Sequence, residues 1–65
     1  MDDRLDTLED AMALSAQIEQ EAPEWKVARC TRYGRWYEVM IYTKDRVLYV
    51  DGLEDWAAIR KRYLP

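Results

Sequence analysis

Histidine and cysteine, which often perform catalysis or hold metal ions, are scarce in this chain of 65 residues. There is no histidine, which removes the commonest general base and a frequent metal ligand. The single cysteine, Cys30, has no second thiol with which to form a disulfide or share a zinc ion. Since no base is available to activate it, we interpret Cys30 as a small buried apolar residue. The sequence therefore predicts a protein that is not an enzyme and has no cofactor or metal.

Carboxylates are frequent, but they are concentrated near the start of the chain. The acidic surface that we expect consists of Asp2, Asp3, Asp6, Glu9, Asp10, Glu19 and Glu21. Nothing in their spacing pairs two of them in a pocket for acid–base chemistry, and so small a domain has little room for a cleft. Such a row could imitate the phosphates of a nucleic acid, or it could be an ordinary solvated helix face.

Basic residues follow in the middle of the chain, at the ends of two expected hairpins. They are Arg32, Arg35, Lys44 and Arg46. They could contact nucleic acid, or they could keep strand edges and turns from aggregating. Because the net charge is −3 and the isoelectric point is near 4.8, binding to a polyanion is the alternative and not the leading hypothesis.

These groups would be positioned by a helix, three strands and a second helix. Apolar residues at helical spacing predict a helix over about 4–21, which starts with acids suited to the helix dipole and stops before Pro23. Runs of β-branched and aromatic residues predict strands over about 25–32, 35–43 and 46–50, and a second helical stripe covers about 52–63. We therefore predict a single α+β domain, a two-layer αβββα fold with an antiparallel meander.

The register of the two hairpins can be predicted by matching side chains across the strands. A first turn at Tyr33-Gly34 pairs Cys30 with Tyr37 and Arg29 with Glu38. A second turn at Lys44-Asp45 pairs strand residues as follows: Tyr42 with Val47, Ile41 with Leu48, Met40 with Tyr49, and Val39 with Val50. A slip of one residue in either hairpin would exchange the two faces.

Both faces of the predicted sheet are apolar. We expect the core on the face made by Ala28, Cys30, Tyr37, Val39, Ile41, Leu48 and Val50. The other face presents Trp25, Val27, Trp36, Met40, Tyr42, Val47 and Tyr49. If one helix covered each face, all of these would be core. Two helices on the first face would leave an aromatic surface of the composition found in protein interfaces, for a second copy or another protein.

The order helix, three strands, helix is similar in topology to the double-stranded-RNA-binding domain over nearly the whole chain. That family presents lysines at the start of its second helix, where this chain has the acidic run Gly52-Leu53-Glu54-Asp55. The exposed aromatics also favour stacking of single-stranded bases, although Tyr33-Gly34-Arg35-Trp36-Tyr37 is not the ribonucleoprotein motif.

In its size and its acidic first helix, which carries Asp2, Asp3, Asp6, Glu9, Asp10, Glu19 and Glu21, the chain resembles the small phage inhibitors of the anti-CRISPR type. That resemblance implies an inhibitor whose partner is a protein complex that handles nucleic acid. No run approaches the ~20 apolar residues of a membrane span, and the start is not that of a signal peptide, so we expect a cytoplasmic protein. We therefore predict a non-catalytic protein-binding module, with nucleic-acid binding as the alternative.

Overall fold

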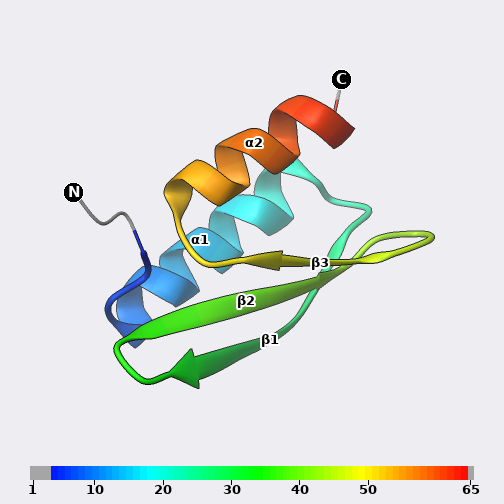
Figure 1. Cartoon of the computed structure of the whole chain (residues 1–65). Coiled ribbons are helices and arrows are strands. Elements are labelled where there is room, and N and C mark those ends of the chain that lie inside the picture. The colour runs from blue at the N-terminus through cyan, green and yellow to red at the C-terminus, as the bar shows by residue number, and fades with distance from the viewer. Residues whose placement is uncertain (1–3, 65) are drawn as a thin grey trace.

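The computed structural model describes residues 4–64, in which a helix, three strands and a second helix follow one another (Figure 1). The elements are α1 (Leu8–Glu21), β1 (Lys26–Tyr33), β2 (Trp36–Tyr42), β3 (Val47–Val50) and α2 (Leu53–Tyr63). The strands form one antiparallel sheet in the order β1-β2-β3. The predicted α+β class and the αβββα order are confirmed.

The first helix begins at Leu8 and not near residue 4, because Thr7 caps it. The Thr7 hydroxyl accepts a hydrogen bond from the backbone N–H of Asp10 at 3.1 Å, which satisfies one of the free donors of the first turn. Leu5 instead takes part in strand-like pairing: its N–H donates to the carbonyl of Asp51 at 2.9 Å, and its carbonyl accepts from Tyr37 at 2.7 Å. These bonds, together with burial of the Leu5 side chain, outweigh an extra helical turn.

The first hairpin turns one residue later than predicted. Tyr33 pairs with Trp36, so the two turn residues are Gly34 and Arg35, and Cys30 pairs with Val39 instead of Tyr37. Gly34 has φ +62°, while no other described residue has positive φ. A glycine at the first of two central positions is typical of a type II′ turn, which matches the twist of the flanking strands. The predicted turn at Tyr33-Gly34 is therefore wrong.

An irregularity in β1 between Val27 and Arg29 exchanges the two faces at the start of this strand. Val27 pairs with Ile41 and Arg29 pairs with Met40, which leaves Ala28 as the extra, exposed residue of a bulge. Val27 therefore lies on the same face as Ile41, against the core, and not on the second face where we predicted it. Ala28 is correspondingly absent from the core.

Trp25, which precedes β1, also packs against the core and not on the second face. Its ring meets Trp56 edge-on at 6.1 Å between centroids and Tyr63 at 6.3 Å. The predictions for Trp25 and Val27 are wrong for the same reason. Both assumed that side chains alternate regularly between the two faces along the whole strand, whereas β1 has a bulge between Val27 and Arg29.

The second hairpin has the predicted register. Met40 pairs with Tyr49 and Val39 with Val50, as expected for a turn at residues 44–45. Thr43 stabilises this turn, since its hydroxyl accepts from the backbone N–H of Arg46 at 3.1 Å and its own N–H donates to the carbonyl of Arg46 at 2.9 Å.

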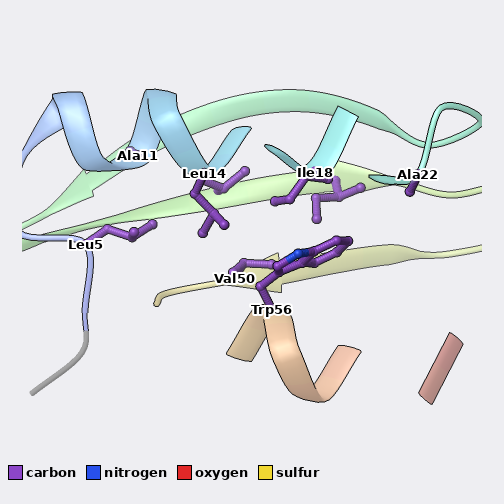
Figure 2. Close-up of a cluster of buried hydrophobic side chains, with 9 residues drawn as sticks. Leu5, Ala11, Leu14, Ile18, Ala22, Val50 and Trp56 are labelled. Carbon is purple, nitrogen blue, oxygen red and sulfur yellow. The ribbon is translucent and has the colours of Figure 1, made fainter. Parts of the chain in front are cut away.

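Both helices lie on one face of the sheet, as Figure 1 shows, and the core fills the space between the two layers. Its buried members come from both layers, the helices and the sheet, and from the segments that flank α1. They are Leu5, Ala11, Leu14, Ile18, Ala22, Val39, Ile41, Val50 and Trp56. Figure 2 shows the indole of Trp56 reaching from α2 toward the side chains of α1. The domain is a small compact two-layer unit, and within residues 4–64 no helix lies over the other face of the sheet (Figure 1).

Candidate interaction surfaces

Cys30 lies half-buried between β1 and α1, with its Sγ atom 3.4 Å from the Oγ atom of Ser15. The Ser15 hydroxyl donates to the carbonyl oxygen of Ala11 at 2.8 Å, so it is held against its own helix. A hydroxyl is not a base that could generate a thiolate. Among residues 4–64, no three His, Cys, Asp or Glu side chains are grouped to hold a metal ion. The arrangement around Cys30 is suited to packing.

The surface that stands out is the sheet face opposite the helices, which we call the open face. Its side chains, assigned from the register, are Lys26, Arg29, Thr31, Tyr33, Trp36, Glu38, Met40, Tyr42, Val47 and Tyr49. Tyr49 is 55% exposed and Tyr42 48%. Five of the seven side chains predicted for this face lie on it, and the structure adds Tyr33. The five are Trp36, Met40, Tyr42, Val47 and Tyr49.

Trp36 is partly covered by a contact that the sequence did not reveal. The guanidinium carbon of Arg4 lies 4.0 Å from the centroid of the Trp36 ring, a cation–π arrangement. Arg4 reaches this place because residues 4 and 5 run alongside the sheet, with Leu5 turned to the core. The freely accessible aromatics of the open face are therefore the tyrosines, and Trp36 marks one end of it.

The acids at the start of the chain fall into two separate groups. The described ones are Asp6, Glu9 and Asp10 near the start of α1 and Glu19 and Glu21 near its end; Asp2 and Asp3 lie outside the described residues. Asp10 and Glu19 are nine positions apart, which is ~13 Å along a helix. Exposed Met12, Ala13 and Ala16 occupy the interval. The helix thus carries two acidic patches and not one continuous row.

Glu21 has a structural partner in the other helix. Its carboxylate accepts from the Nη1 of Arg60 at 2.6 Å and from the Nε2 of Gln17 at 2.7 Å. These hydrogen bonds, that of Arg60 above all, lower the pKa of Glu21 from its usual value. Of the predicted acidic residues, Glu21 therefore ties α1 to α2 and is the least available to a partner.

The four predicted hairpin cations do not come together. Arg32 and Arg35 lie at one end of the sheet and Lys44 and Arg46 at the other, separated by the seven residues of β2, or ~24 Å. Arg46 is also engaged, since its Nη1 donates to the hydroxyl of Tyr63 at 3.1 Å. A different pair, Lys26 and Arg29, shares the open face with the tyrosines.

Glu38 lies on the open face opposite Thr31, and not opposite Arg29 as predicted, because the first turn is shifted. Burial, and then the neighbouring carboxylate of Asp51, raise the pKa of Glu38 above its usual value. Added negative charge beside these two carboxylates would therefore be unfavourable.

No protein family, curated protein or solved structure matches this chain. Within residues 4–64, neither helix is long and apolar enough to cross a membrane.

Proposed function

We propose that this protein is a non-catalytic protein-binding module that binds a helix of another protein on its open face. The observation that supports this proposal is the group of half-exposed side chains, Tyr33, Tyr42, Val47 and Tyr49, on a sheet face that carries no helix. Tyrosine and methionine are enriched in protein interfaces, since their rings and thioethers give large contact areas.

The dimensions of the open face suit one helix. Three strands ~4.8 Å apart span ~10 Å between the outer strand axes, and the seven residues of β2 extend ~24 Å. A helix is ~10 Å across, and ~16 residues of it cover ~24 Å. An amphipathic helix with an apolar stripe would lie along the strands and complete a third layer, in the way that such helices fill apolar grooves.

A second copy of the chain is a less suitable occupant. A strip of ~10 by ~24 Å offers well under the ~800 Å² that each partner contributes to a stable interface. Two such faces would associate weakly, whereas a larger protein can add contacts beyond the strip. We therefore expect a monomer at micromolar concentration, which sedimentation equilibrium would measure.

The proposal is tested by capturing partners from the native host with three proteins: the wild type, the double variant Tyr42→Ala with Tyr49→Ala, and the control Gln20→Ala on exposed α1. A partner of the open face is retained by the wild type and the control and lost with the double variant. Circular dichroism should show all three folded, because neither tyrosine is in the core. A double variant that retains every partner, or that unfolds, would contradict the proposal.

The inhibitor function implied by the acidic helix is a second candidate, supported by the exposed group Asp6, Glu9 and Asp10. Along the axis of a DNA duplex, each strand carries one phosphate per ~3.4 Å. The ~13 Å gap before Glu19 therefore limits mimicry to a short stretch. Changing the three acids to Asn or Gln should weaken capture, and raised salt should do the same, only if this patch binds the partner.

Nucleic-acid binding is favoured by one observation, the presence of Lys26 and Arg29 on the same face as Tyr42 and Tyr49. Tyrosines beside cations can stack single-stranded bases. Against it stand the net charge of −3 and the separation of the hairpin cations. Fluorescence anisotropy with labelled oligouridine at physiological salt discriminates the two: micromolar binding that is lost in the tyrosine double variant would assign the open face to nucleic acid.

A further inference from the structure

The two outer strands of the sheet differ in how their edges are protected. β3 has four residues, and just beyond its end the carbonyl of Asp51 accepts from Leu5, so that residues 4 and 5 close this corner. β1 has eight residues, and within residues 4–64 its backbone makes no hydrogen bond to any element other than β2. An outer strand presents unpaired N–H and C=O groups at alternate residues, which is a template for an added strand.

A groove runs along this free edge, between β1 and α1. Its volume is about 370 Å³, and its lining consists of Met12, Ser15, Ala16, Glu19 and the β1 residues 27–30. Met12 is 60% exposed there, although it is apolar. The groove adjoins Ala28, the bulge residue without a partner in β2. Small and apolar side chains beside an open strand edge leave room for side chains of an added strand.

The charges of β1 define what can be added. The strand carries Lys26, Arg29 and Arg32 and contains no Asp or Glu. In an antiparallel pairing of β1 with a second copy, cations would have no carboxylate opposite them in any register, and like charges across a ladder are destabilising. The edge is thus protected against self-pairing while it attracts a segment of opposite charge.

We propose that the free edge of β1 binds an extended acidic segment of another protein as a fourth strand of the sheet. Side chains of an added strand alternate between the two faces. Acidic residues would point to the side of Lys26 and Arg29, and small apolar residues would point into the groove beside Met12 and Ala16. Glu19 at the groove excludes acids from that side, so the recognised pattern is acid alternating with apolar. This site uses the backbone edge of β1 and meets the open face only at Lys26 and Arg29, so it can be tested separately from the helix proposed for the open face.

The test uses a peptide as long as β1 in which Glu alternates with Val, added to the full-length protein and followed by NMR. We expect chemical-shift changes in β1 and on the side of α1 that faces it. Hydrogen exchange should slow at the backbone N–H groups of β1 that point away from β2. Two matched peptides serve as controls: one with Lys in place of Glu, and one N-methylated at alternate residues on the pairing edge. Neither should bind, because the first reverses the charge and the second removes the strand donors.

Two exposed variants test the geometry without touching the core. Arg29→Glu should weaken the acidic peptide about tenfold and make the Lys peptide the better ligand. Met12→Glu should weaken it about threefold by placing a charge in the groove. Tyr49→Ala, on the open face, should bind as the wild type does, which keeps this result separate from that of the open face.

The proposal is overturned if no peptide of the alternating acidic pattern binds, or if the N-methylated peptide binds equally well, since charge alone would then explain the contact. It is also overturned if the shifts map to Val47 and Tyr49 of β3, on the opposite side of β2 from the free edge. Oligouridine that binds β1 more tightly than the acidic peptide would assign these cations to nucleic acid.

Discussion

The two faces of the sheet are built from alternate residues of the same strands, yet one face is buried and the other is largely exposed. On β2, Val39 and Ile41 are fully buried under the helices, while Tyr42, the next residue, is half exposed. Bulky residues on both faces had two explanations, a three-layer core or an unoccupied surface. Helix width decides between them: two helices side by side span ~20 Å, enough to cover one face of a three-stranded sheet.

The largest expected effect tests which face is inside. Val39→Asp would place an unpaired carboxylate among fully buried apolar side chains, which costs several kcal/mol, while a domain of this size has only about 5 kcal/mol of stability. We expect this variant to be unfolded by circular dichroism and by NMR dispersion.

The matched control is Tyr49→Asp, which introduces the same group on the open face. It should remain folded, with a loss of stability of about 1 kcal/mol from weakened strand propensity. A folded Val39→Asp protein, or an unfolded Tyr49→Asp protein, would mean that the two faces are assigned the wrong way round.

A second pair of variants compares the tryptophans of the two faces. Trp56 is 2% exposed, and Trp56→Ala should lower the free energy of unfolding by about 3–5 kcal/mol because it leaves a cavity that small residues cannot fill. Trp36→Ala, which removes only the contact with Arg4 and some burial, should cost about 1 kcal/mol. Urea unfolding measures both, and equal losses would contradict a one-sided core.

The second hairpin could be predicted from the sequence because apolar residues match across it in one register only. The first could not be placed by that criterion, since Gly34 fits either central position of a two-residue turn. The turn residues themselves carried a signal. The first central residue of a favoured two-residue hairpin turn has positive φ, which is unfavourable for Tyr33 and easily adopted by Gly34. The conformational preference of glycine would thus have placed the first turn at Gly34-Arg35, where matching of side chains across the strands did not.

The bulge at Ala28 has no signature of its own, and it caused the errors at Trp25 and Val27. A strand cannot place Val27 and Cys30 on one face unless its alternation is broken between them. The core demands this break, because the ring of Trp25 packs against Trp56 of a distant helix. The open face was predictable where alternation is regular, along β2, and unpredictable where a tertiary contact overrides it.

A smaller effect tests how α2 is held against α1. Arg60 lowers the pKa of Glu21, so the ionised carboxylate stabilises the folded state above the usual pKa of about 4.5. This contribution is lost as the pH falls through the lowered pKa of the folded state. Glu21→Gln should therefore be slightly less stable than the wild type near neutral pH, and the difference should vanish in acid. Thermal unfolding across this range measures it, with Glu19→Gln as the unpaired control.

The smallest effect is expected at Glu38, on the open face, where the sign is opposite. Burial and Asp51 raise the pKa of Glu38, so the folded state binds its proton more tightly than the unfolded chain does. Stability is therefore lost as the pH rises from the usual value through the raised one. Glu38→Gln mimics the protonated form, and it should equal or slightly exceed the wild type near neutral pH, within about 0.5 kcal/mol. The two proteins should converge in acid. A Glu38→Gln protein that is clearly less stable than the wild type at neutral pH would contradict this expectation. It would show that the ionised carboxylate of Glu38 makes a favourable contact in the folded state.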